Sequence, residues 1–223
     1  HATRHNTTTD LTPAEIHEIG LKEVKRIRAE MQSIIDKLGF RGSFADFAKF
    51  LRSDPRFYFK SADELLDAYR ALSRRIDPLL VKIFRTLPRM PYGIEPMPGN
   101  VAADSYVGSY RSPAADGSRA GTFMVNTYKP EIRPKYEMIA LSLHEGVPGH
   151  HLQIAIAQKL EGLPEFRKHT ENSAYAEGLS LQLEKAVAYA SRGRGSRKRP
   201  STGWASLTPA ELDVVRLVAA VEP

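Results

Sequence analysis

The sequence predicts an α+β fold that is predominantly α-helical and carries one small antiparallel β-hairpin. Three observations lead to this prediction. Apolar residues recur at helical spacing over much of the chain. Helix start signals precede these apolar stripes. Only two short segments, 106–111 and 121–127, are rich in β-prone residues, and turn-forming residues lie between them. With 42% hydrophobic residues among 223, the chain is long enough to bury a core.

Three amphipathic helices are expected in the first 87 residues. Each is expected to start where a Ser or Thr cap is followed three positions later by an acidic residue, at Thr12, Ser43 and Ser61. The first helix should be long and should end at Gly39. The apolar stripe of the third helix runs to Leu87 but passes Asp77–Pro78, where we expect a kink or a break because proline removes a backbone donor.

Two segments are expected to lack helices and central strands. Residues 1–10 are polar without periodicity, which favours an irregular entry segment. Four prolines between positions 88 and 98 favour a structured connector, because proline cannot donate to a sheet ladder. The antiparallel hairpin of segments 106–111 and 121–127 is expected to follow this connector.

The segment from Tyr136 to Gln153 has the outline of a metal site. An apolar helix starting at Pro134 would present His144 and Glu145 side by side. A catalytic zinc needs His or carboxylate ligands, one open position for water, and a nearby carboxylate to accept the water's proton. The common H-E-x-x-H spacing would require a histidine at position 148, but this chain has Pro148 there.

The second histidine ligand is therefore open between His150 and His151. If Pro148–Gly149 is extruded as a bulge, His150 falls where the second ligand of an unbroken helix would lie, so it ranks ahead of His151. The competing interpretation is an ordinary solvated helix end that happens to carry three histidines. A further helix is expected from His150 to Glu161, and another from Asn172 to Tyr189.

Four ordered motifs in the chain also carry a family resemblance. They are H-E-G-V-P-G-H-H-L-Q at 144–153, G-T-F-M-V-N-T at 121–127, L-P-E-F-R at 163–167 and A-E-G-L-S-L at 176–181. Together they resemble the bacterial DUF885 family, which is similar to gluzincin-type zinc peptidases. The resemblance implies a zincin-like metal helix, with Glu177 as a third zinc ligand supplied by a separate helix.

The resemblance also implies a peptide substrate. In such peptidases an edge strand near the metal helix binds the substrate backbone, and the segment Gly121 to Thr127 is the candidate for that strand. Asn126 is then a candidate substrate contact, although it could equally close a turn of a purely structural hairpin. Tyr128, Tyr175 and His151 are candidates to contact either a metal ligand or the substrate.

The predicted function is a zinc-dependent metallopeptidase. Zn²⁺ on His144, His150 and Glu177 would hold a water molecule that Glu145 activates as general base for attack on the peptide carbonyl. An alternative is an inactive or incomplete metal-binding fragment of such a peptidase. A second alternative is a nucleic-acid-associated protein that binds through the basic C-terminal tail.

The domain prediction assigns residues 1–190 to a DUF885-like metallopeptidase domain, present as a fragment, and residues 191–223 to a basic linker with an extra helix. Five arginine and lysine residues between positions 192 and 199 supply most of the net charge of +6. The tail either contains a diverged family segment at 215–218 or, over 203–219, resembles the opening of a LuxR-type helix-turn-helix. Specific DNA reading is not expected, because the sequence lacks the second helix that would enter the major groove.

Composition bounds the environment of the protein only loosely. No apolar run approaches the roughly 18 residues of a membrane span, and the absence of cysteine excludes a disulfide framework or a thiolate metal site. The chain begins at His1 without a visible signal peptide, and we expect its N-terminus to be truncated. Both cytoplasmic and exported locations therefore stay open, as does the oligomeric state.

Overall fold

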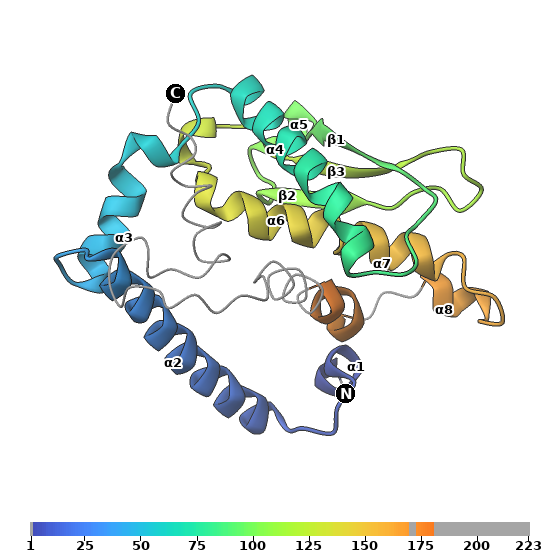
Figure 1. Cartoon of the computed structure of the whole chain (residues 1–223). Coiled ribbons are helices and arrows are strands. Elements are labelled where there is room, and N and C mark those ends of the chain that lie inside the picture. The colour runs from blue at the N-terminus through green and yellow to red at the C-terminus, as the bar shows by residue number, and fades with distance from the viewer. Residues whose placement is uncertain (1, 170–172, 181–223) are drawn as a thin grey trace. The chain divides into compact units, whose positions relative to one another are not determined.

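The structure, a computed structural model of the chain, describes residues 2–169 and 173–180 (Figure 1). It is predominantly helical with one small three-stranded sheet, so the predicted α+β class is confirmed. The described residues fall into two compact units, one up to Phe57 and one from Tyr58 onward. The tail predicted for residues 191–223 lies outside the described residues.

The first unit contains three helices and a short 3-10 turn. They are α1 (Ala2–Thr7), α2 (Pro13–Leu38), α3 (Phe44–Ser53) and the turn Pro55–Phe57. Helix α1 corrects the expectation of an irregular start. The predicted capping boxes of α2 and α3 are both formed, and α2 ends at Gly39 in the left-handed conformation, with φ 70°. The starts and ends of these helices are therefore set by local hydrogen bonds, as predicted.

The second unit begins with α4 (Ala62–Ile76), which is capped by Ser61 and followed by a 3-10 helix over Asp77–Lys82. The break expected at Asp77–Pro78 is present. Helix α4 buries an apolar stripe that includes Leu65, Leu72 and Ile76. Its Tyr69 ring packs edge-on against Phe123 with 5.5 Å between ring centroids, and Phe123 is fully buried. This contact joins α4 to the sheet.

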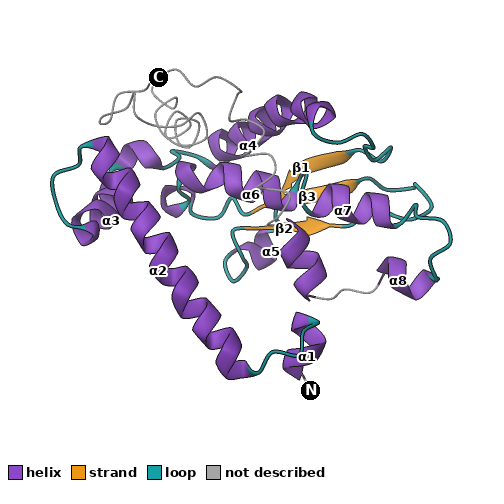
Figure 2. Cartoon of the chain, turned by 60° about the horizontal axis from the view of Figure 1, so that its bottom comes forward, coloured by secondary structure: helices purple, strands orange, loops and turns teal. Residues whose placement is uncertain are grey.

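The sheet contains β1 (Tyr92–Pro96), β2 (Gly108–Arg111) and β3 (Gly121–Val125), in the order β1-β3-β2 (Figure 2). Strands β2 and β3 form the predicted antiparallel hairpin. Strand β1 pairs parallel to β3, so the proline-rich connector is more ordered than expected. It is an edge strand, which is the position in a sheet that tolerates proline.

The central position of β3 corrects a functional prediction. The segment Gly121 to Thr127 was the candidate edge strand for a substrate, but β3 is paired on both sides, with β1 and with β2. A substrate backbone therefore has no side of β3 to add to. Among the described strands, β2 and β1 form the two edges of this sheet.

The remaining helices follow the sheet in the chain. They are the short α5 (Gly99–Ala102) between β1 and β2, 3-10 turns over Pro130–Ile132 and Lys135–Glu137, α6 (Met138–Glu145), α7 (His150–Ala157), α8 (Glu165–His169) and a helical segment over 173–180. Helices α6 and α7 are both shorter than predicted. None of the helices in the described part of the chain has the length and apolar character needed to cross a membrane.

Candidate metal centre

A tight break between α6 and α7 places the two ends of the H-E-G-V-P-G-H-H segment close together. Helix α6 ends at Glu145, and α7 begins at His150. The Gly149 amide donates to the Leu143 carbonyl at 2.8 Å, and the His151 amide donates to the Gly146 carbonyl at 3.1 Å. A Cβ atom on residue 149 would overlap the carbonyl of His144, so only glycine permits this approach.

Three predicted ligands meet at this break. The Nε2 atom of His144 lies 3.1 Å from Glu177 Oε2, and the Nε2 atom of His150 lies 3.9 Å from Glu177 Oε1. The two imidazole rings are 4.7 Å apart and nearly perpendicular, at 80°. One donor atom from each residue falls within 4.8 Å of the others, so the group could hold a metal ion.

The donor set has a chemistry and a spacing that would allow it to hold a metal ion, and zinc serves as the comparison. Two imidazole nitrogens and one carboxylate oxygen are a ligand set that catalytic zinc sites use. Ligands placed tetrahedrally at about 2.0 to 2.1 Å from zinc lie roughly 3.3 to 3.4 Å from one another. The two measured separations, 3.1 and 3.9 Å, lie on either side of this value. Both histidine side chains are largely buried, while Glu177 is 59% exposed, so the group opens on the glutamate side.

The orientation of His150 is fixed by groups on its other ring nitrogen. Its Nδ1 atom lies 3.1 Å from the buried Ser180 hydroxyl and 3.4 Å from Gln153 Oε1. These contacts leave Nε2 directed toward Glu177. Gln153 also donates through Nε2 to the Tyr175 carbonyl at 2.8 Å, which ties α7 to the helical segment 173–180. The residues that orient His150 therefore also join α7 to the helical segment that supplies Glu177.

His151 occupies a different environment from its neighbour. Its Nε2 lies 2.9 Å from the Met90 carbonyl oxygen, and its Nδ1 lies 2.7 Å from the Tyr110 hydroxyl. Because a carbonyl only accepts, Nε2 carries the proton and Nδ1 accepts from Tyr110. The side chain is 1% exposed, and burial lowers the pKa of His151 to about 4. The structure thus places His150, and not His151, with His144 and Glu177.

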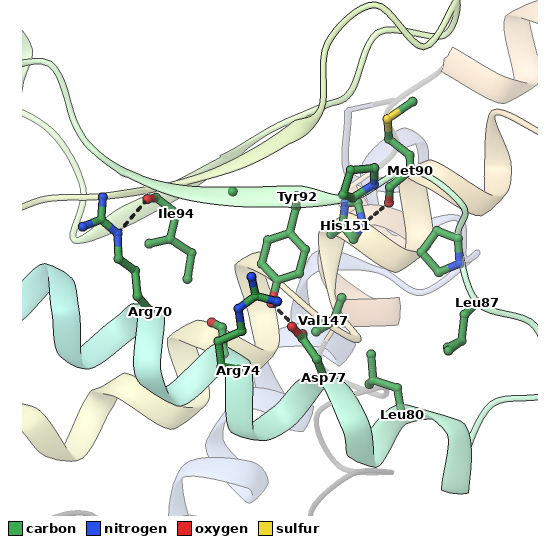
Figure 3. A pocket seen from close by; sticks show the side chains of 14 residues that line it. Arg70, Arg74, Asp77, Leu80, Leu87, Met90, Tyr92, Ile94, Val147 and His151 are labelled. Carbon is green, nitrogen blue, oxygen red and sulfur yellow. Dashed lines mark hydrogen bonds between the residues drawn. The ribbon is translucent and has the colours of Figure 1, made fainter.

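A cavity of about 550 Å³ lies beside the segment 144–153, and His151 and Val147 form part of its wall (Figure 3). Tyr92 extends into this region, where its hydroxyl donates to Asp77 Oδ1 at 3.1 Å. Its ring lies 4.8 Å from the His151 ring, centroid to centroid. Burial raises the pKa of both Asp77 and Tyr92. The packing of Tyr92 against His151 therefore supports the segment 144–153 from within the protein, and it keeps the His151 ring away from the candidate metal ligands.

Glu145 and the three clustered residues line one cavity of about 670 Å³. Glu145 is 8% exposed and follows His144 directly at the end of α6. Tyr175 also lines this cavity, so this predicted contact lies at the site. The cavity therefore brings together a possible metal-binding group, a buried carboxylate and a tyrosine.

Two other predicted contacts lie elsewhere. Asn126 is 1% exposed, and its amide nitrogen donates to the carbonyls of Ala102 and Tyr106 at 2.7 and 2.9 Å. Its Oδ1 accepts from the Tyr128 amide at 3.0 Å, so Asn126 closes a loop and is not a substrate contact. Tyr128 is not among the described residues that line the cavity. The structural alternative for Asn126 is thus the correct one.

Three residues at the site escaped the sequence analysis. Tyr110 on β2 bonds His151 and lines the cavity, while Ser180 and Gln153 contact His150. Ser180 belongs to the A-E-G-L-S-L motif, three positions after Glu177, so helical spacing could have indicated it. Tyr110 gave no such signal, because its partner lies 41 residues away.

Comparison with known proteins agrees with the motifs. The model of the family described as bacterial protein of unknown function (DUF885) matches residues 1–190. A solved structure described as a lipoprotein, from Colwellia psychrerythraea, is similar with a TM-score of 0.81 and 29% identity, covering 99% of this chain and 36% of that chain. This chain therefore spans little more than a third of the solved protein.

A second set of matches is short. Proteins described as HTH-type transcriptional regulators, from Mycobacterium bovis and two strains of Mycobacterium tuberculosis, are 65% identical over 46 residues, which is 21% of this chain and 5% of each regulator. The origin of the C-terminal tail stays a prediction. Because the DUF885 model matches 190 of the 223 residues, this chain belongs to the DUF885 family of bacterial proteins.

Proposed function

We propose that this protein is a zinc-dependent peptide hydrolase. The observation that carries the proposal is the meeting of His144, His150 and Glu177 in one cavity with the buried carboxylate of Glu145. Two imidazoles and a carboxylate with an open side are the ligand arrangement of a hydrolytic zinc site, and the adjacent glutamate supplies the base that such a site needs.

The reaction divides between the metal and the protein. Zinc, when bound, supplies Lewis acidity that lowers the pKa of water to about 7 and polarises a carbonyl. His144, His150 and Glu177 would hold the ion, and Ser180 with Gln153 orients the imidazole of His150 so that its Nε2 atom faces Glu177. Glu145 accepts the proton of the attacking water and later delivers it to the leaving amine. Tyr175 lines the same cavity and is a candidate for stabilising the developing oxyanion.

Strand β2 replaces β3 as the proposed strand for substrate binding. In an antiparallel pair, residues that hydrogen-bond the partner strand alternate with residues that do not. The Asn126 amide donates to the Val107 carbonyl, so the backbone groups of Ser109 and Arg111 also face β3. The backbone groups of Gly108 and Tyr110 therefore point away from β3, and both residues line the cavity. An extended peptide added beside β2 would bond these groups and pass the metal ligands.

The test compares wild-type protein with Glu145→Gln at equal zinc content. The substitution keeps the size of the side chain and removes its basicity, so we expect zinc to stay bound and hydrolysis of an unstructured peptide mixture to fall by at least about 100-fold. Peptide products are measured by mass spectrometry and zinc by elemental analysis. Equal turnover of the two proteins would refute the role of Glu145. No turnover by zinc-loaded wild type would instead favour an inactive metal-binding fragment.

Nucleic-acid association is a second candidate, supported by the 46-residue match with the mycobacterial regulators and by the basic tail. Five cationic side chains between positions 192 and 199 can neutralise phosphates without reading bases. This activity would be independent of the metal group, and deletion of residues 191–223 would separate the two.

A further inference from the structure

One wall of the site cavity carries basic side chains that the hydrolytic chemistry does not use. Arg167, Lys168 and His169, at the end of α8, line the same cavity as the candidate metal ligands. None of them is needed to hold a metal or to move a proton in the proposed reaction. Their presence therefore bears on what the cavity binds.

The charge of Lys168 is already matched by an acid on its own helix. Its Nζ lies 2.7 Å from Glu165 Oε1, and this hydrogen bond lowers the pKa of Glu165. His169 also lies near that carboxylate, with Nε2 3.8 Å from Oε2. Arg167 differs, because within the described part of the chain its guanidinium forms no ion pair, and its backbone amide bonds only the Pro164 carbonyl. The excess charge on this wall is that of Arg167.

The balance of charges in a loaded cavity points in the same direction. The carboxylates of Glu145 and Glu177 offset the two positive charges of a zinc ion, and Glu165 offsets Lys168. Among the described residues that line the cavity, the charge of Arg167 is then left over. A cavity of about 670 Å³ is the size of a small-ligand site, so a group that reaches Arg167 lies close to the candidate metal group.

We infer that the cavity selects peptides that carry a carboxylate near the bond to be cleaved, and that Arg167 binds this carboxylate. The planar guanidinium can donate two parallel hydrogen bonds to the two oxygens of such a group. The inference rests on the proposed hydrolase function and names its substrate class. The carboxylate can belong to the C-terminus of the peptide or to an Asp or Glu side chain.

The experiment uses three short peptides that are identical up to the last residue. The first two share a neutral last residue and end in a free or an amidated C-terminus, and the third has Glu as its last residue and an amidated C-terminus. Binding to zinc-loaded Glu145→Gln protein is measured by calorimetry, and hydrolysis is measured with wild type. We expect the free acid to bind about tenfold more tightly than the amide, the contribution of one charge-assisted hydrogen-bonded pair at a partly exposed site. Arg167→Ala should remove this difference, whereas Arg85→Ala, an exposed arginine outside both cavities, should keep it.

The outcomes distinguish failure of the carboxylate site from failure of the proposed hydrolase function. Equal binding of all three peptides, no binding of any peptide, or a preference that survives in Arg167→Ala would overturn the carboxylate site. Recovery of tight binding by the Glu-terminated amide would identify a side-chain carboxylate as sufficient, and failure to recover would assign the site to the C-terminus. When Glu145 is kept and hydrolysis is measured, Arg167→Ala should raise KM for the free-acid peptide and leave kcat unchanged, because the contact is made equally in the ground state and the transition state. If wild type hydrolyses none of the peptides, the hydrolase proposal fails while the binding comparison still decides the carboxylate site.

Discussion

Two adjacent histidines at the start of α7 have opposite environments, and this difference defines the site. His150 turns toward His144 and Glu177, while His151 turns inward to the Met90 carbonyl and the Tyr110 hydroxyl. Consecutive residues on a helix lie about 100° apart around its axis, so one can serve the cavity and the other the core. Exchange of their roles would require a rearrangement of both.

Metal retention should distinguish these two histidines. His150→Ala removes a donor, so we expect zinc content after dialysis to fall sharply below the roughly one ion per chain expected for wild type. His151→Gln should retain zinc, because its side chain lies outside the group of donors. Ser180→Ala should lower zinc affinity by about tenfold, the usual cost of losing a group that orients a ligand. Elemental analysis and competition with a chelator measure these effects, and loss of zinc from His151→Gln alone would reverse the assignment.

The burial of His151 predicts a pH dependence of stability. Its pKa is lowered to about 4 in the folded chain, against an ordinary value of 6.5. Between these two pH values the unfolded chain binds more protons than the folded chain. The stability that neutral His151 contributes is therefore fully present above about pH 6.5 and is lost as the pH falls toward 4. The loss attributable to His151 is roughly 3 kcal/mol at most, from the size of the shift.

Urea unfolding of metal-free protein at pH 7, 5.5 and 4.5 measures this loss. His151→Gln should flatten the dependence, while His17→Gln, on exposed α2, should leave it as in wild type. Parallel slopes for wild type and His151→Gln would contradict the buried neutral imidazole.

At the scale of elements, the site depends on how closely α6 and α7 approach. Gly149 lies at their junction, where any side chain would meet the carbonyl of His144. Strand β2 contributes a second constraint, since Tyr110 reaches from the sheet to His151. The metal segment is thus held between a helix break and a sheet edge. Its position is a property of three elements together.

Gly149→Ala should therefore damage both stability and metal binding. Forcing a methyl group against the His144 backbone should cost about 1–3 kcal/mol in the free energy of unfolding, as for other overpacked positions. The shift of α7 should also lower zinc affinity. Gly99→Ala is the matched control, because a Cβ there meets nothing within 4 Å, and it should change stability by no more than about 0.5 kcal/mol. Urea titrations of both variants make the comparison, and equal stability of the two would refute the close approach.

At the scale of the whole molecule, the metal group and the basic tail are separable parts of the sequence. The donors lie between positions 144 and 177, while the cationic run begins at position 192. The family match also ends at residue 190. Any nucleic-acid binding should therefore be removable without removing the metal donors.

Deletion of residues 191–223 should abolish weak duplex DNA binding and leave zinc content unchanged. The undeleted 223-residue chain should bind duplexes of different sequence equally, with a salt dependence no steeper than a slope of about −4.5 in log K against log salt, the limit set by five neutralised phosphates. Fluorescence anisotropy at several salt concentrations measures this. Sequence-dependent binding, or binding that survives the deletion, would contradict a purely electrostatic tail.

The sequence alone determined the features that depend on nearby residues. The helix starts at Thr12, Ser43 and Ser61 follow from side chains that bond backbone groups three positions away. The local sequence is therefore enough to predict them. The hairpin of β2 and β3 and the helix break at Pro78 were predictable for the same reason. The adjacent pair His144 and Glu145 likewise drew attention to the site from local pattern alone.

Tertiary structure decided what depends on distant partners. The addition of β1 beside β3 moved β3 to the centre of the sheet and left β2 as the edge at the cavity, an outcome that no local pattern encodes. Asn126 was buried by loop carbonyls 20 to 24 residues earlier in the chain. Glu177 reached His144 across 33 residues, and the choice between His150 and His151 was made by Met90, Tyr110 and Ser180. Periodicity reports which face of an element is apolar, but it does not report which element that face meets.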